Sequence, residues 1–443
     1  MRARFVSLPV AAIAVASCFQ VEPLPDCGDR AGEDGLHTPH YLCMPRAGEP
    51  LQMPVAPRRL LRGDFDDEGV DNDFAVLLDL GRIQIHTTRD QKTKLSAELE
   101  MDGQIEAITA ARFFDGGEHG DDLLGVTAGK PMSGTAGKVF GFHNGGDVFA
   151  LAVKEQFEAA TLFPWGNCPA PNSIEAPEVV GTNQAAGLAI GCDSGPPPEG
   201  KPEEEPLDGM VVKADSGVLF AAQKRGGLQI PELTGVHAVN VAQLDGLAFE
   251  DIVFAHRPID SEHESLAVYL VQEDAFGGQP QDPERLDIPL ARYDIRRVLL
   301  DDLDGDGDVD LVAVHPAARG LSVVRQRRSE PLLFEDPQYF DVGQEIRDAV
   351  LGDFTGDGEV DIAVAHDVDG TGLNGVSVLI RTPDLTPGQV DYALAPAGEV
   401  SGEIVDLEPL DYDGDGRIDI GAVLKVGSEG RVFFWLNRSP AGG

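Results

Sequence analysis

Short apolar runs separated by clusters of Gly and Asp dominate the C-terminal half of the chain. Three of these runs are rich in Val, Ile and Ala: Asp310-Leu-Val-Ala-Val, Asp361-Ile-Ala-Val-Ala and Asp419-Ile-Gly-Ala-Val. Runs of this length, bounded by turn residues and rich in β-branched side chains, predict buried strands rather than helices. We therefore expect an all-β chain built from repeated strand–turn–strand units.

The turn before each of these strands repeats one acidic pattern. Counted from its first Asp as position 1, oxygen-bearing side chains stand at positions 1, 3, 5 and 9, and position 7 can offer its backbone carbonyl. Glycines at positions 4 and 6 permit the positive φ angles of a tight loop. Crowded carboxylates repel one another by about 1 to 4 kcal/mol per close pair unless a cation lies among them, and oxygen ligands at this density suit Ca²⁺. The candidate calcium ligands are Asp302, Asp304, Asp306, Asp308 and Asp310; Asp353, Thr355, Asp357, Glu359 and Asp361; and Asp411, Asp413, Asp415, Arg417 and Asp419.

Two features refine this metal prediction. An EF-hand is excluded, because position 12 holds Ala313, Val364 or Ala422 instead of a bidentate Glu. The Asp353 loop is the weakest of the three, since Thr355 offers a neutral hydroxyl at position 3. Acidic turns that hold no metal are the alternative for all three loops.

The last Asp of each loop serves as an anchor in the search for further repeats. Degenerate copies of the pattern, called worn copies below, end at Asp251, Asp122 and Asp73. A copy without acidic ligands lies near Gly187. The loop before Asp73 is acidic but carries one extra residue. The sequence leaves open whether that loop binds metal through Asp64, Asp66, Glu68 and Asp73.

Seven repeats of about four strands each predict a seven-bladed β-propeller over residues 50–440. After Asp419 only one further strand remains, Arg431 to Leu436, so the last blade lacks its outer strand. The segment Pro50 to Val55 stands where such a strand belongs, and we expect it to pair with the last blade and close the ring. The alternative is six blades with an irregular insert between residues 140 and 235.

The repeated strand–acidic loop–strand unit resembles the FG-GAP/VCBS repeat of integrin α-chain propellers and of many bacterial surface proteins. The resemblance covers residues 50–438, with specific motifs in the last three blades and weak ones in the other four. It implies a propeller in which calcium is structural. Some polysaccharide lyases resemble the same repeat family and use propeller-bound calcium. A lyase would need a cluster of His, Tyr, Lys or Arg at a concave end of the ring, and the sequence shows no such concentration.

Charge and the N-terminal segment indicate the partners and the compartment. The net charge of −42 argues against nucleic acid or an anionic membrane surface as a partner. Residues 1–17 combine Arg2 and Arg4 with a short apolar run and are typical of a signal peptide. The run ends in Val-Ala-Ser-Cys18, which resembles a bacterial lipoprotein box and implies lipidation of Cys18, with ordinary cleavage as the alternative. Phe19 follows where inner-membrane lipoproteins often carry Asp, so an outer-membrane or surface location is implied.

The remaining cysteines are even in number, as expected in an oxidising compartment. Proximity along the chain suggests a Cys27–Cys43 disulfide within the tether of residues 18–49 and a Cys168–Cys192 disulfide across the third blade. We expect a monomer that touches the membrane only through its lipid.

These observations favour a calcium-stabilised, extracytoplasmic propeller that acts as a binding or scaffold module for a protein or polysaccharide ligand and is not an enzyme. A lyase-like enzyme on the same propeller and a purely structural component of an envelope complex are the alternatives, because a propeller fold alone does not fix function.

Overall fold

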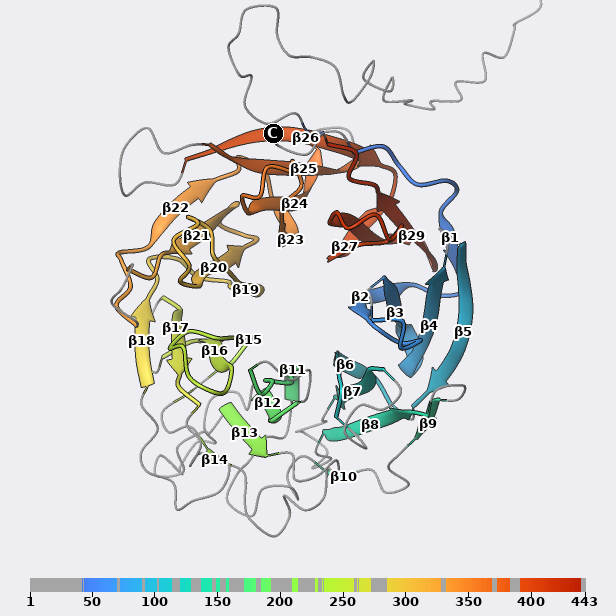
Figure 1. Cartoon of the computed structure of the whole chain (residues 1–443), viewed down its shortest axis with the longest axis horizontal. Coiled ribbons are helices and arrows are strands. Elements are labelled where there is room, and N and C mark those ends of the chain that lie inside the picture. The colour runs from blue at the N-terminus through green and yellow to red at the C-terminus, as the bar shows by residue number, and fades with distance from the viewer. Residues whose placement is uncertain are drawn as a thin grey trace, which may run out of the picture.

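The strands of the chain pair in seven antiparallel sheets that stand around one central axis (Figure 1). The computed structural model describes residues 42, 44–69, 72–89, 92–101, 103–113, 120–128, 137–145, 149–151, 157–158, 171–180, 185–192, 209–213, 228–229, 233, 235–258, 261, 263–271, 285–327, 332–368, 373–382 and 391–439. The predictions for the signal peptide, Cys18, Cys27, Cys43 and Cys168 lie outside these residues.

Each sheet is built mainly from strands that are consecutive in the chain. In chain order the sheets contain β2 (Pro57–Gly63), β3 (Asp73–Leu78), β4 (Arg82–Arg89) and β5 (Lys92–Glu100); β6 (Ile105–Ala111), β7 (Asp122–Thr127), β8 (Lys138–Asn144), β9 (Phe149–Leu151) and β10 (Phe157–Glu158); β11 (Pro171–Glu175), β12 (Gly187–Cys192), β13 (Gly209–Lys213) and β14 (Leu228–Gln229); β15 (Ala238–Ala242), β16 (Asp251–His256), β17 (Ser265–Tyr269) and β18 (Arg285–Pro289); β19 (Arg297–Asp301), β20 (Asp310–His315), β21 (Gly320–Val324) and β22 (Gln338–Asp341); β23 (Ile346–Gly352), β24 (Asp361–Val368), β25 (Leu373–Thr382) and β26 (Asp391–Val400); and β27 (Glu403–Leu410), β28 (Asp419–Val426), β29 (Glu429–Trp435) and β1 (Leu51–Met53).

The anchors found in the sequence mark the sheets. Every anchor is the first residue of the second strand of one sheet, from Asp73 in β3 to Asp419 in β28, and Gly187 begins β12. The predicted all-β propeller is confirmed. The described residues contain one short 3-10 helix, η1 (Asp79–Gly81), and no helix there has the length and apolar character needed to span a bilayer.

The N-terminal strand closes the ring, as predicted. Strand β1 pairs antiparallel with β29, with Leu51 opposite Val432 and Met53 opposite Gly430. A bridge between Arg46 and Trp435 extends this pairing toward the N-terminus. The last sheet therefore combines three strands from the end of the chain with one from its beginning.

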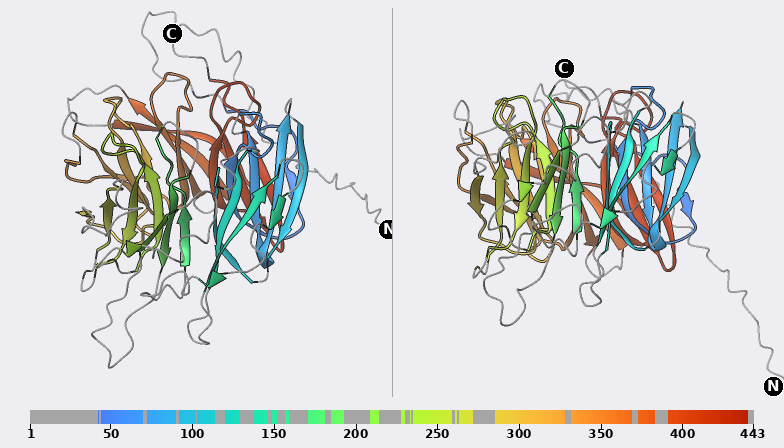
Figure 2. Two further views of the ribbon diagram at one scale, coloured as in Figure 1. Left: turned by 60° about the horizontal axis from the view of Figure 1, so that its bottom comes forward. Right: turned by 90° about the horizontal axis from the view of Figure 1, so that it is seen from below.

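The hydrophobic core lies between neighbouring sheets, which stand upright side by side when the ring is seen from its edge (Figure 2). The second strands β3, β7, β12, β16 and β20 are buried along their whole length. Val312 and Val314 of β20, for example, share one cluster with Ile346 and Ile362 of the next sheet. Since both faces of these strands are covered, continuous apolar runs are the pattern they require.

Candidate metal centres and the axial cavity

The carboxylate of the first Asp in each predicted calcium loop accepts hydrogen bonds from backbone N–H groups of the same loop. Asp302 accepts backbone N–H bonds from Gly305 and Asp306 at 2.8 and 3.1 Å through Oδ1, and from Gly307 at 2.9 Å through Oδ2. Both glycines have positive φ, 73° and 95°, as the glycine positions predicted. The loops beginning at Asp353 and Asp411 form corresponding bonds.

Two of the three predicted loops gather their carboxylates around one point. Oxygens of the grouped residues lie within 4.8 Å of one another, and the groups are Asp302, Asp304 and Asp306 in one loop and Asp411, Asp413 and Asp419 in the other. Asp308, Asp310 and Asp415 are not part of these groups. Among the described residues the Asp353 loop forms no such group of three acids, because Thr355 stands at position 3.

The position 3 carboxylates fit a cation most clearly. Oδ1 of Asp304 and Oδ1 of Asp413 are buried and have no hydrogen-bond partner. Burial, followed by repulsion from Asp306, raises the pKa of Asp304. A buried oxygen that accepts nothing is costly, and a hard cation among three carboxylates would satisfy it. The donor set therefore fits Ca²⁺.

The anchor aspartates at position 9 have a structural role that the sequence did not reveal. Asp310 is fully buried; its Oδ2 accepts the N–H of Leu303 in its own loop at 3.1 Å, and its Oδ1 accepts the N–H of Gln326 after β21 at 2.8 Å. Burial raises its pKa to about 8. The same pair of hydrogen bonds occurs in a worn copy, where Asp251 accepts the N–H groups of Leu244 and Val271.

The anchors as calcium ligands therefore stay a prediction, to which the structure adds a backbone role. Asp419 belongs to the carboxylate group of its loop, and Asp310 lies outside the corresponding group. Both anchors also fasten the loop to the end of the third strand through backbone N–H groups. Asp251 has the same role in a loop without the other acids, because buried backbone N–H groups need acceptors.

Arginines beside the loops were also missed. Arg325 lies 3.4 Å from Oδ2 of Asp304, Arg381 pairs with Glu359, and Arg438 pairs with Asp413 and Asp415. Each of these arginines lies at, or next to, the residue whose backbone N–H bonds to the anchor. Arg417, predicted to offer its carbonyl, donates its guanidinium to the carbonyl of Ser439 at 2.9 Å.

The residue that caps the anchor also reaches the loop of the preceding sheet. Nε2 of Gln326 donates to the carbonyl of Leu244, the position 2 residue of that loop, at 3.1 Å. We call this contact the inter-sheet latch. Corresponding contacts, to a carbonyl at position 1, 2 or 3 of the preceding loop, occur at three other seams, as Asn144 to Phe65, Arg381 to Asp304 and Asn437 to Asp353.

An axial cavity of about 850 Å³ lies inside the ring, lined by the first strand of every sheet. Arg297 forms its main ion pairs, at 2.9 Å to Asp348 and 3.2 Å to Glu408, and it also donates to the carbonyl of Leu407 at 2.9 Å. Although burial opposes it, the nearby carboxylates raise the pKa of Arg297. Arg59 lies 3.5 Å from Glu175 across the ring.

The cavity holds the arginine cluster that the sequence did not reveal. Its arginines come from two short segments far apart in the chain, Arg58, Arg59 and Arg62 in β2 and the Arg296–Arg297 pair at the start of β19. Only closure of the ring brings them together. Each contacts a carboxylate or a carbonyl. His237 also lines the cavity, and among the described residues no Phe, Tyr or Trp does.

Of the predicted disulfides, the structure describes only one cysteine, Cys192, which is fully buried in β12 and disulfide-bonded. Its expected partner Cys168 lies outside the described residues.

Comparison with known proteins agrees with the repeat architecture. Residues 302–364, which span the Asp302 and Asp353 loops, match a family model described as an FG-GAP-like repeat. A search of curated proteins finds no match to the chain. The matched repeat and the surrounding sheets are consistent with an FG-GAP β-propeller.

Proposed function

We propose that this FG-GAP-type chain is a seven-bladed, calcium-stabilised β-propeller that works outside the cytoplasm, tethered by a lipid on Cys18, as a binding or scaffold module for a protein or polysaccharide. The observation that carries the calcium role is the buried, unpartnered Oδ1 at position 3 of two acidic loops, Asp304 and Asp413. The fold supports a binding or scaffold role, since propellers present loops from several blades at each end of the ring.

Calcium would be structural in this proposal. Asp302, Asp304 and Asp306 would hold one ion, and Asp411, Asp413 and Asp419 another. The Asp353 loop would hold a third ion more weakly, because Thr355 brings no charge. At millimolar Ca²⁺ and the affinity of extracellular modules, each site would stabilise the folded chain by about 0.4 to 1.4 kcal/mol.

Chelation tests this role. We expect EDTA to lower the melting temperature of the wild-type chain, and the double variant Asp304→Ala and Asp413→Ala to abolish most of the difference between EDTA and Ca²⁺. Asp245→Ala is the matched control, because Asp245 stands at position 3 of a worn loop and accepts the N–H of Leu247 at 2.8 Å. The measurement is thermal unfolding in both buffers, and identical wild-type melts would rule calcium out.

The axial cavity supports a role without catalysis. A lyase needs a base free to reach its substrate. The arginines of the cavity are engaged by carboxylates and carbonyls. His237, which also lines the cavity, has its Nε2 at 3.4 Å from Glu264. Arg297 of β19 forms ion pairs with an acid of β23 and an acid of β27. This single side chain therefore connects three blades.

The ligand class can be found by retention. The chain from residue 19 is mixed with purified polysaccharides and envelope extracts in Ca²⁺ or EDTA, and both retention and released sugar are recorded. Calcium-dependent retention without release supports the binding module and identifies its ligand. Release of unsaturated or reducing ends would show an enzyme instead.

A further inference from the structure

The first acidic loop has the architecture of a metal loop. Oxygens of Asp64, Asp66 and Asp73 lie within 4.8 Å of one another. Asp64 accepts the N–H groups of Glu68 and Gly69 at 3.0 and 3.1 Å, as the first Asp of the later loops does. Oδ1 of Asp66, at position 3, is buried without a hydrogen-bond partner, as are the corresponding atoms of Asp304 and Asp413. The acids of the first loop therefore resemble those of the predicted calcium loops, and a difference must come from the residues around them.

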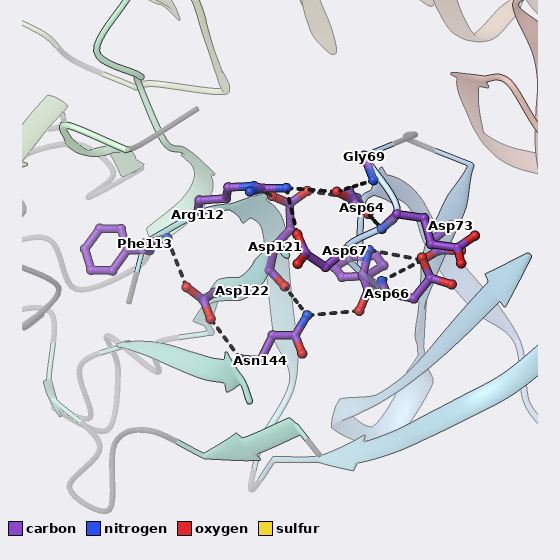
Figure 3. Close-up of polar contacts among 12 residues, drawn as sticks. Asp64, Asp66, Asp67, Gly69, Asp73, Arg112, Phe113, Asp121, Asp122 and Asn144 are labelled. Atoms are coloured by element: carbon purple, nitrogen blue, oxygen red, sulfur yellow. Dashed lines mark hydrogen bonds and ion pairs between the residues drawn. The ribbon is translucent and has the colours of Figure 1, made fainter. Parts of the chain in front are cut away.

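An arginine that follows the first strand of the next sheet contacts this loop at its first acid. Nη2 of Arg112 lies 2.9 Å from Oδ2 of Asp64 and 3.3 Å from Oδ1 of Asp67, and its Nε lies 3.9 Å from Oδ1 of Asp121 (Figure 3). The Asp64 side chain is only 5% exposed, so this pair is largely screened from water. Arg89 adds a second cation at the rim, 3.7 Å from Asp66.

Strand register shows where Arg112 comes from. Ala111 pairs with the anchor Asp122, as Asp301 pairs with Asp310, so Arg112 stands at position 1 of the second loop, where Asp302 stands in the fifth sheet. Phe113 at position 2 keeps the ordinary bond to its anchor, at 2.9 Å. The second loop has thus replaced its first acid with a cation that contacts the first acid of the preceding loop.

The C-terminal loops lack this arrangement. Their arginines contact acids at positions 3, 5 and 7. Among the described residues, no arginine or lysine forms an ion pair with position 1 of those loops, Asp302, Asp353 or Asp411, which accept backbone N–H groups. In the part of the chain that the structure describes, a position 1 carboxylate is paired with a guanidinium only where the neighbouring loop supplies Arg112.

We infer that Arg112 takes the place of a divalent cation in the first loop, which makes the seam between the first and second sheets independent of metal. The inference rests on the proposed function, since it states which acidic loop of a calcium-binding ring stays metal-free. It also predicts that the carboxylate group of Asp64, Asp66 and Asp73 becomes a calcium site once the guanidinium is removed.

The test measures calcium stoichiometry by equilibrium dialysis and thermal unfolding in EDTA and in Ca²⁺. We expect Arg112→Gln to bind one more Ca²⁺ per chain than wild type, to melt several degrees lower in EDTA and to recover in Ca²⁺. Arg112→Lys keeps the charge and should gain no ion. Arg58→Gln is the matched control, because Arg58 pairs with Glu106 across the same seam, at 3.0 Å, away from the acidic loop. Its loss of stability should not respond to calcium.

Asp64→Asn in the otherwise wild-type chain gives an independent readout that does not require Arg112→Gln to fold. If the first loop is metal-free, Asp64→Asn leaves the calcium stoichiometry unchanged; a loss of one ion would overturn the inference. An Arg112→Gln variant that folds without a gain in calcium binding would also overturn it. If wild type binds no calcium at all, the proposed function fails, while the response of Arg112→Gln still decides the inference.

Discussion

The anchor aspartates are single residues that each join two backbone segments. Each is buried, and its two oxygens accept N–H groups from its own loop and from the end of the third strand. Burial raises the pKa of Asp251 from 3.8 to about 7. This anchor lies in a loop without predicted metal ligands, so its titration is separate from calcium binding.

A pH dependence follows from Asp251. Below about pH 4 its carboxyl is protonated in both the folded and the unfolded chain, and between about pH 4 and 7 only the unfolded chain ionises. The free energy of unfolding should therefore fall as pH rises, by up to about 4 kcal/mol from this residue, and level off above pH 7. Asp251→Asn should flatten that part of the urea-unfolding profile, whereas Asp336→Asn, a change at an exposed residue, should keep it. Parallel profiles for wild type and Asp251→Asn would contradict the assignment.

At the scale of the strands and loops, the inter-sheet latch connects neighbouring sheets through side chains as well as through the core. Gln326 is the best-isolated case, since it is 2% exposed and its amide reaches the carbonyl of Leu244. Gln326→Leu keeps the volume but removes the donor, and we expect the free energy of unfolding to fall by about 1 to 3 kcal/mol. Gln52→Leu, on the exposed edge strand β1, should change it by less than about 0.5 kcal/mol. Equal effects in urea unfolding would show that the latch adds nothing.

The strand elements were largely predictable because most of the buried second strands are short apolar runs that follow turns rich in Gly and Asp. Gly187 could be found as an anchor without any acid because the apolar run after it is retained. The latch and the loop arginines were not predictable. They depend on which side chain follows the third strand, and those positions hold Asn, Gln or Arg with no shared pattern.

At the scale of the whole molecule, contacts across the ring were the least predictable. Arg59 and Glu175, or Arg297 and Glu408, are far apart in the chain and meet only because the first strands of all sheets surround one axis. The net charge of −42 indicated excess acid but not its distribution. Inside the ring, the arginines lie close together and form ion pairs with carboxylates. At the acidic loops, the carboxylates outnumber the arginines.

Ring closure by β1 sets an order in time. Its partner β29 ends at Trp435, so the first strand has no partner until nearly all of the seven sheets have been synthesised. Until then the earlier blades can form one after another, but the ring stays open with an unpaired edge. The pairing of Leu51 with Val432 is therefore the last step of ring formation.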